Sequence, residues 1–221
     1  MCGRFVLTAN PDVIQTAFDL TTIPASMSAR YNIAPTQPVA VITNEQPHPL
    51  TFYQWGLIPS WSKDVSIGSK MINARSESAA EKPSFRSAFK RRRCIIPADG
   101  FYEWRQSGSE KTPMFIHFEG QKVFGIAGLW EVWHSPDGSE VRTCTILTTD
   151  ANDFMQSIHN RMPVILHKED YPLWLSPDEE PAPILQELMK PYSGDDLTAY
   201  PVSKMVNKPG NDMPDLIQPV A

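Results

Sequence analysis

The chain has 221 residues, of which 41% are hydrophobic and 20% charged, and its formal net charge is −5. This composition is typical of a globular protein and excludes the disordered and fibrous classes, while the length favours a single domain over residues 1–221. The start of the chain lacks a signal-peptide pattern and no apolar run is long enough to cross a bilayer. We therefore expect a cytoplasmic protein without a membrane segment, or a nuclear one in a eukaryote.

The first predicted element is a helix. Asn10, Pro11 and Asp12 supply an N-cap, a proline at the first helical position and an acidic first turn, and the helix should end near Leu20. Runs rich in β-branched and aromatic residues then predict strands at 39–43, 50–57, 94–97, 101–104, 114–118, 123–129 and 141–149. Further short helices are expected near Ser84, Asp150, Lys168 and Pro183.

The order of these elements indicates the fold class. Strands outnumber helices and do not alternate regularly with them, so a doubly wound parallel sheet is not expected. The 21 prolines also disfavour long helices. We predict an α+β fold with a curved, largely antiparallel, barrel-like sheet and short peripheral helices. The polar, proline-rich segment 190–221 should lie as a tail across the body.

Charge is distributed unevenly along the chain. Residues 1–105 carry 12 Lys and Arg against 8 Asp and Glu, whereas residues 106–221 carry 8 against 17. The basic run 90–93, with Arg86 beside it, lies in the first half. A local basic face can bind phosphate despite an acidic total, but a solvated edge of basic side chains would give the same pattern.

Cys2 is the first residue with distinctive chemistry. Cys2, Cys94 and Cys144 form no even framework and no Cys-x-x-Cys pair, so we expect neither disulfides nor a zinc site. Initiator methionine is removed before a small residue, which would leave Cys2 with a free α-amine and a thiol. The amine, with a reference pKa of about 7.7–8.0, can attack an aldehyde, and the thiol can then close a five-membered thiazolidine ring. An incidental small residue at this position is the alternative.

Other candidate residues could bind an anionic partner. Arg4, after the small Gly3, can bind phosphate near the terminus. Asn73 and Arg75 would share one face of an extended segment, although a turn asparagine and a surface ion pair between Arg75 and Glu77 remain an alternative.

Two groups could transfer protons. Glu103 lies among aromatic residues, where burial would raise its pKa, but strand alternation could equally turn it outward. His159 lies between a predicted helix and a strand, where it could act as an acid or base or form a structural hydrogen bond. None of the five histidines has metal-ligand spacing, so no metal or cofactor is expected.

Six motifs in order resemble the SRAP family of abasic-site processing proteins. They are Met1-Cys2-Gly3-Arg4-Phe5, Tyr31-Asn32-Ile33-Ala34-Pro35, Trp55-Gly56-Leu57-Ile58-Pro59-Ser60-Trp61, Ile72-Asn73-Ala74-Arg75-Ser76-Glu77, Ala98-Asp99-Gly100-Phe101-Tyr102-Glu103-Trp104 and His159-Asn160-Arg161-Met162-Pro163. The resemblance implies a sensor and shield of abasic sites in single-stranded DNA, cross-linked through Cys2. It gives Asn73, Glu103 and His159 as catalytic partners.

The resemblance further implies that Arg4, Asn32, Trp61, Arg75 and Arg161 bind the DNA. Ser62 stands where some relatives have the second tryptophan of a pair, which would weaken stacking there. Relatives are described as peptidase-like because a longer precursor must expose its cysteine. Here only Met1 precedes Cys2, so a host aminopeptidase could suffice; a lyase outcome through the imine also stays open.

Two other functions fit parts of the sequence. A glutamine amidotransferase of the N-terminal nucleophile class also exposes a cysteine after Met1, and it would release ammonia from glutamine. A plain single-stranded DNA-binding module would bind intact and abasic strands equally and reversibly. For the cross-linking protein, one reactive terminus suggests a monomer, associated with the nucleoid at damage in a bacterium.

Overall fold

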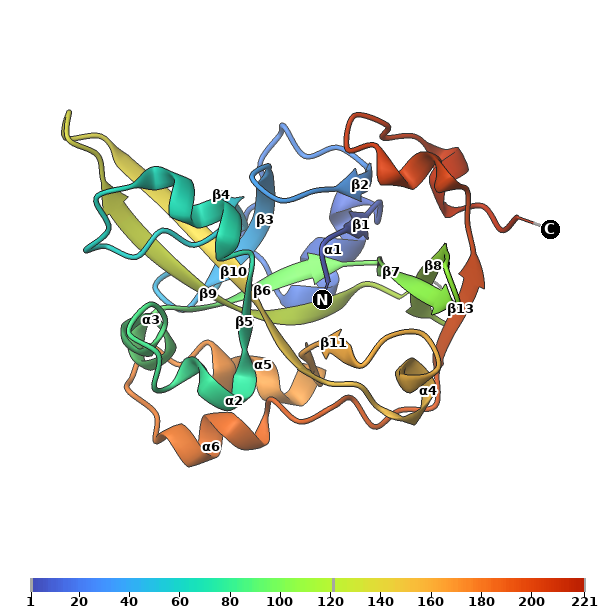
Figure 1. Ribbon diagram of the computed structural model, residues 1–221. Coiled ribbons are helices and arrows are strands. Elements are labelled where there is room, and N and C mark those ends of the chain that lie inside the picture. Colours follow the sequence, from blue (N-terminus) through green and yellow to red (C-terminus); the bar gives the residue numbers. More distant parts are fainter. Residues whose placement is uncertain (1, 121, 221) are drawn as a thin grey trace.

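Two β-sheets with short helices around them form the protein, as seen in a computed structural model that describes residues 2–120 and 122–220 (Figure 1). The strands are β1 (Phe5–Leu7), β2 (Arg30–Ile33), β3 (Pro38–Thr43), β4 (Thr51–Trp55), β5 (Asn73–Arg75), β6 (Arg93–Ala98), β7 (Gly100–Ser107), β8 (Glu110–Phe118), β9 (Phe124–His134), β10 (Glu140–Asp150), β11 (Arg161–Pro163), β12 (Ile165–Leu166) and β13 (Leu197–Pro201). The α-helices are α1 (Pro11–Phe18), α2 (Ser76–Ala79), α3 (Arg86–Arg91), α4 (Asp153–Gln156), α5 (Tyr171–Trp174) and α6 (Ala182–Glu187), and the 3-10 helices are η1 (Val65–Lys70), η2 (Lys168–Asp170), η3 (Lys204–Asn207) and η4 (Pro214–Ile217).

The smaller sheet has the order β13-β8-β7-β1-β2, and every pairing in it is antiparallel. The larger sheet has the order β11-β10-β4-β3-β6-β9-β12, with β5 also paired to β10. Its pairings are antiparallel except for β10 with β4 and β10 with β5. These sheets and short helices confirm the predicted α+β class and the largely antiparallel pairing.

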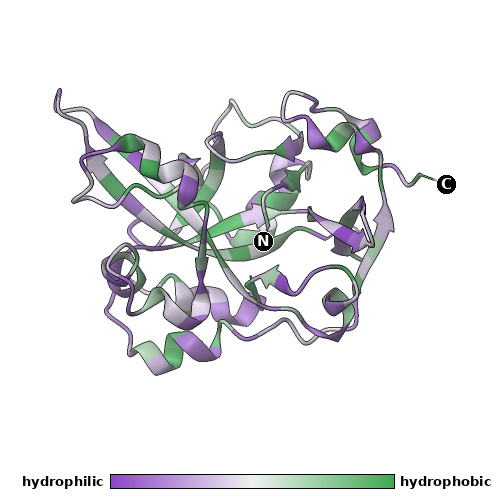
Figure 2. Ribbon diagram, viewed as in Figure 1, coloured by the Kyte–Doolittle hydropathy of each residue, from purple (hydrophilic) through white to green (hydrophobic). Residues whose placement is uncertain are grey.

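Strand β10 is the centre of the larger sheet. It pairs with its sequence neighbours β9 and β11 and with the distant strands β4 and β5, so four strands take their register from it. Its hairpin with β9 extends away from the body to a hydrophilic tip (Figure 2). Strand β9 runs beyond the predicted 123–129 to His134, because Trp130 and Trp133 are still buried and paired with β10, and β10 runs one exposed residue beyond 141–149 at each end.

The core lies on both faces of β1. Phe5 and Leu7 belong to the main hydrophobic cluster, whereas Val6 packs with Tyr102 and Leu216 in a second one. This division follows from strand alternation, which sends successive side chains to opposite faces. Since β1 is buried on both sides, the residues just ahead of it are held inside the molecule rather than at its surface.

The C-terminal segment is more deeply integrated than the predicted tail. Strand β13 adds an edge to the smaller sheet, with Leu197 opposite Phe118 and Pro201 opposite Met114. The following chain returns along β2, where the Asp212 carboxylate accepts the main-chain N–H of Tyr31 at 2.5 Å. Proline at the end of this strand is compatible with its edge position, because an edge strand needs fewer donors.

The loop that leads from β4 to β5 depends on one close approach between glycines. Gly56 has φ of +130°, and a Cβ there would lie 2.6 Å from the carbonyl oxygen of Gly68. We expect Gly56→Ala to lower the free energy of unfolding by about 2–4 kcal/mol, because it combines backbone strain with a clash against main chain.

Gly108→Ala is the matched control. Gly108 also has positive φ, but a Cβ there would meet nothing within 4 Å, so the expected loss is about 1 kcal/mol. Urea unfolding of both variants checks the difference. Equal losses would show that the contact between Gly56 and Gly68 is not tight.

Candidate active site

Cys2 is buried and lies three residues before Phe5, the first residue of β1. Its side chain has no exposed surface, and its Sγ lies 3.7 Å from the carbonyl oxygen of Arg4. Burial raises the pKa of this thiol far above its ordinary value, and the negative charge of Glu103 raises it further. The thiol is therefore protonated at neutral pH, and the carboxyl of Glu103 is close enough to interact with it.

Asn73 holds the residue next to the chain start. It opens β5, where it lies opposite Ile146 of β10, and its Nδ2 donates a hydrogen bond to the carbonyl oxygen of Cys2 at 2.8 Å. Among residues 2–120 and 122–220, the Oδ1 of the same amide has no hydrogen-bond partner, although it is buried. A buried acceptor that lacks a partner is costly, so this oxygen beside Cys2 is a candidate to accept a hydrogen bond from a bound group.

Glu103 projects inward from β7. Strand alternation places it on the same face as Phe101 and opposite to Tyr102, which resolves the orientation that the sequence left open. Only 2% of its surface is exposed, and this burial raises the pKa of its carboxyl, while the charge of His159 acts to lower it. Glu103 thus lies within electrostatic reach of both Cys2 and His159.

His159 lies in the turn between α4 and β11. Its main-chain N–H donates to the carbonyl of Met155 at 2.8 Å, and its ring Nδ1 accepts the main-chain N–H of Arg161 at 3.0 Å. The same Nδ1 lies 3.2 Å from the carbonyl oxygen of Arg161, so the main chain of Arg161 offers this nitrogen a partner in either tautomer. The structure thus brings together the four predicted catalytic residues, although their catalytic roles stay predictions.

Arg4 and Asn32 face the C-terminal segment. Arg4 donates through Nη1 to the carbonyl of Val206 at 2.8 Å, and burial lowers the pKa of its guanidinium. Asn32 is fully buried, and its Nδ2 lies within hydrogen-bond distance of the carbonyls of Val206, Lys208 and Asn211. Both residues hold residues 206–211 against β2, so contact with DNA is a role that these hydrogen bonds neither require nor test.

The other three predicted DNA-binding residues differ in exposure. Trp61 is 60% exposed in the loop after β4, and Arg75 is exposed at the end of β5. The side chain of Arg161 is only 11% exposed and forms ion pairs with Glu77 and Asp150. Glu77 therefore forms its ion pair with Arg161, whereas the sequence suggested the neighbouring Arg75 as its partner.

The basic run 90–93 is largely occupied within the protein. Arg93 is fully buried and donates to main-chain carbonyls, including that of Trp174 at 2.8 Å. Arg92 forms an ion pair with Glu131 at 2.7 Å, and Lys90 and Arg91 both face Glu179. The contacts of residues 90–93 therefore favour the alternative of a structural, partly solvated edge over a phosphate-binding face.

Sequence reasoning missed several residues around the site. Glu77 was present in the motif with Asn73 but was considered only as a partner of Arg75, while Asp150 and Asp212 carried no signal at all. Asp212 lies 180 residues from Asn32, and Asp150 reaches Arg161 through the pairing of β10 with β11. No pattern within one segment could have found them.

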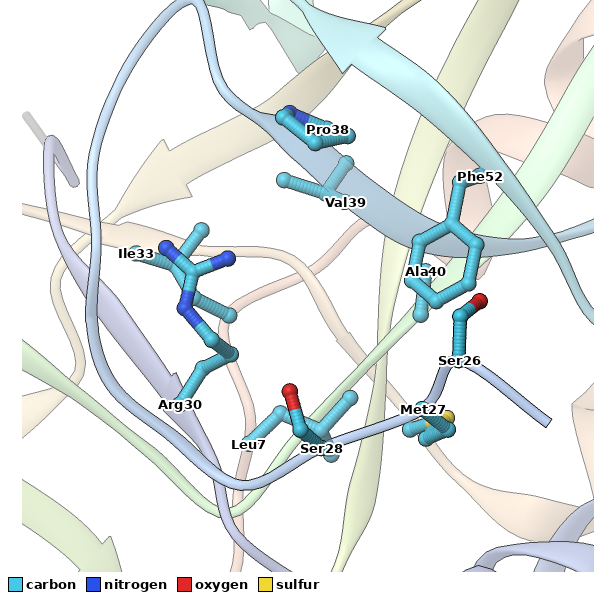
Figure 3. Close-up of a pocket in the computed structure, with 10 residues that line it drawn as sticks. All are labelled: Leu7, Ser26, Met27, Ser28, Arg30, Ile33, Pro38, Val39, Ala40 and Phe52. Atoms are coloured by element: carbon cyan, nitrogen blue, oxygen red, sulfur yellow. The ribbon is translucent and has the colours of Figure 1, made fainter. Parts of the chain in front are cut away.

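A cavity of about 340 Å³ is lined by residues from β1 to β4 and from the chain just before β2 (Figure 3). Leu7, Ile33, Val39 and Phe52 are among its apolar walls, and Arg30 at its side is held by Asp212 and Gln37. None of the nine candidate residues lines it. Within residues 2–120 and 122–220, no three His, Cys, Asp or Glu side chains are grouped to hold a metal ion, and no helix is long and apolar enough to cross a membrane.

Comparison with known proteins gives one consistent family. The family described as SOS response associated peptidase (SRAP) matches residues 1–209. The abasic site processing protein YoqW of Bacillus subtilis is 46% identical over 99% of both chains, and the abasic site processing protein HMCES of Xenopus tropicalis is 35% identical over 75% of this chain and 56% of its own. A crystal structure of a Bacteroides thetaiotaomicron protein, 28% identical, superposes over all of both chains with a TM-score of 0.89.

The raised pKa of Glu103 predicts a pH dependence of stability. The ordinary value is 4.5, and folding raises it, so the folded protein keeps a proton that the unfolded chain releases between the two values. This proton therefore stabilises the folded protein fully below pH 4.5. The stabilisation is lost as the pH rises from 4.5 to the higher pKa of Glu103 in the folded protein.

Between pH 4.5 and the raised pKa of Glu103, we expect wild type to lose stability relative to Glu103→Gln. Above that pKa, the difference in the free energy of unfolding between the two proteins should stay constant. Urea unfolding of both proteins from about pH 4 to about pH 8 measures this difference. A gain of wild-type stability relative to the variant with rising pH would contradict the assignment of a raised pKa.

Proposed function

The chain belongs to the SRAP family, and from this membership and the site we propose that it processes abasic sites in single-stranded DNA by covalent capture through Cys2. The observation that carries the proposal is the position of Cys2, whose carbonyl accepts the Asn73 amide and whose side chain lies within reach of the Glu103 charge. An aminothiol beside an amide and a buried carboxyl suits condensation with an aldehyde. The named relatives are abasic site processing proteins, which supports the same substrate.

The first step is release of the Cys2 amine. While Met1 is attached, this nitrogen is part of a peptide bond and cannot attack an aldehyde. An aminopeptidase supplies the cleavage; self-cleavage, as the family description suggests, is a second route through the same groups. The reaction begins only once the terminus is free, so a chain with a permanent extension would be inert.

The amine attacks before the thiol. Burial keeps the Cys2 thiol protonated, so the thiolate is not the initial nucleophile. Glu103 accepts a proton from the Cys2 ammonium, and the neutral amine adds to the sugar aldehyde to give a carbinolamine. Glu103 then returns the proton to the departing hydroxyl, which leaves as water and gives the imine. A raised pKa suits the carboxyl to both transfers.

Ring closure completes the capture. The sulfur adds to the imine carbon, the thiol proton passes to the nitrogen, and the product is a thiazolidine with one water released overall. Because closure is intramolecular, its effective concentration is high and the adduct resists hydrolysis. If closure fails, the imine is the intermediate from which strand cleavage by a lyase reaction would proceed.

His159 and Asn73 act on the sugar. The abasic deoxyribose is mostly a closed hemiacetal, and His159 assists its opening to the aldehyde by proton transfer through Nε2. The buried Oδ1 of Asn73 accepts a hydrogen bond from the ammonium or from a sugar hydroxyl. Its Nδ2 meanwhile keeps Cys2 in place.

The predicted DNA-binding residues contribute to different extents. Trp61 offers an exposed face for base stacking and Arg75 an exposed cation for phosphate, so these two contribute most. Arg4 and the fully buried Asn32 act by holding residues 206–211 beside β2. Arg161 contributes less charge, because Glu77 and Asp150 neutralise it. One reactive terminus per chain suits a monomer that forms one adduct per lesion.

Replacement of Cys2 tests separately the carbon–nitrogen bond and the carbon–sulfur bond of the adduct. Cys2→Ala and Cys2→Ser both keep a small second residue and a free amine but lack the thiol, so they can form only the imine. We expect heat-stable conjugate with an abasic oligonucleotide to fall at least about 100-fold in both, since ring closure is lost. Borohydride should still trap the imine.

Denaturing gels and intact-mass measurement of the conjugate check this result. Two controls are an oligonucleotide without the lesion and wild-type protein carrying an uncleavable N-terminal extension, neither of which should give conjugate. Heat-stable conjugate from Cys2→Ala at the wild-type rate would show that another residue forms the bond.

His159→Gln tests the acid–base step. General acid–base catalysis contributes about 10²–10⁴-fold, so we expect conjugate formation at saturating DNA to slow by about 100-fold or more. Binding to an intact strand, measured by fluorescence anisotropy, should be retained. A large loss of binding with unchanged chemistry at saturation would make His159 a DNA-recognition residue instead.

A further inference from the structure

Arg161 is clamped by a carboxylate from another segment. Its Nη1 donates to Glu77 Oε1 at 2.5 Å and its Nη2 to Glu77 Oε2 at 3.0 Å, so the pair is bidentate. The same guanidinium donates to the Asp150 carboxylate and to the Thr148 carbonyl, each at 2.6 Å. A planar guanidinium with four such contacts has little freedom to rotate.

This clamp joins the two segments that carry Asn73 and His159. Glu77 belongs to α2, directly after β5, and Arg161 opens β11, two residues after His159. Strands β5 and β11 both pair with β10, with Arg75 opposite Thr148 and Arg161 opposite Asp150, but no pairing joins them to each other. The ion pair of Glu77 with Arg161 therefore spans β10 where no main-chain hydrogen bonds do so.

The orientation of the His159 ring depends on Arg161. The ring Nδ1 lies 3.0 Å from the main-chain nitrogen of Arg161 and 3.2 Å from its carbonyl oxygen, so the main chain of Arg161 holds this side of the ring. Glu103, the group that interacts with this ring, lies on the other sheet. Any shift of Arg161 would therefore move the ring relative to the carboxyl with which it must work.

We propose that Glu77 is a positioning residue, which acts through Arg161 to hold His159 in register with Asn73 and Glu103. This role rests on the proposed covalent capture of abasic sites. Glu77 is half exposed, and exposed ion pairs contribute little to stability. Its effect is therefore geometric, and it should be visible in the chemistry rather than in the unfolding transition.

If Glu77 acted only through its charge, Glu77→Gln would change conjugate formation in the direction opposite to that expected from a positioning role. Glu77 places a negative charge beside the predicted DNA-binding residues Arg75 and Arg161, where it repels phosphate. If that were its main effect, Glu77→Gln would bind single-stranded DNA more tightly and form conjugate faster at limiting DNA. A positioning role instead predicts slower chemistry at saturating DNA.

The test compares Glu77→Gln with Glu45→Gln. Glu45 also forms an ion pair with an arginine, Arg142, and has nearly the same exposure, 51% against 48%, but lies away from the site. At saturating abasic DNA, we expect Glu77→Gln to form conjugate about tenfold more slowly, since small misplacements of catalytic groups carry penalties of that order or larger. Glu45→Gln should match wild type, and Glu77→Asp should recover part of the loss.

A double-mutant cycle with His159 shows whether Glu77 acts through that ring. In a His159→Gln background, Glu77→Gln should cause little further loss, because the group that it positions is already absent. In addition, the ring resonances of His159 in the DNA-free protein should shift in Glu77→Gln and not in Glu45→Gln. That NMR measurement needs no DNA chemistry.

Three results would overturn the proposal. They are a wild-type conjugation rate in Glu77→Gln, an undiminished tenfold effect of Glu77→Gln in the His159→Gln background, and unchanged His159 resonances. Failure of wild-type protein to form any conjugate would instead remove the proposed function, and with it this role, while the NMR shift would still report the coupling between Glu77 and His159.

Discussion

One hydrogen bond, from Asn73 Nδ2 to the carbonyl of Cys2, joins the start of the chain to the centre of the larger sheet. The position of Asn73 is fixed by the parallel register of β5 on β10, so the core determines where Cys2 lies. Chain termini are usually the least ordered part of a domain. Here the terminal segment is instead buried on both faces of β1, and a reactive group placed there is held in one geometry before any substrate arrives.

The site also requires both sheets. Glu103 comes from the smaller sheet, while Asn73 and the His159 turn belong to the larger one. A carboxyl held between the two is desolvated, and the resulting rise in its pKa is unfavourable for folding at neutral pH. Groups whose pKa is shifted at such a cost are concentrated where proton transfer is needed. Burial of Glu103 therefore lowers the stability of the fold at neutral pH, and it gives a carboxyl whose raised pKa suits acid–base chemistry.

The sequence predicted the longer elements but not the contacts that connect them, and the roles of the site residues that it named stay predictions. Strands with sustained apolar patterns, such as β3 and β6, were located within one or two residues. Strands β5 and β12 have only three and two residues, too few for a period to be recognised. The face occupied by Glu103 was ambiguous because aromatic residues flank it on both sides. The Glu77–Arg161 pair spans 84 residues, and no local pattern specifies such a contact.

Complete burial of Cys2 would slow an enzyme that must release its product and bind the next substrate. In the proposed reaction the product stays attached, so no release step exists to be slowed. Exclusion of water then has only favourable consequences, because hydrolysis is the reaction that would reverse the imine and open the ring. Single-turnover capture and a buried terminus are thus compatible for one physical reason: the environment that hinders exchange with solvent is the one that preserves the adduct.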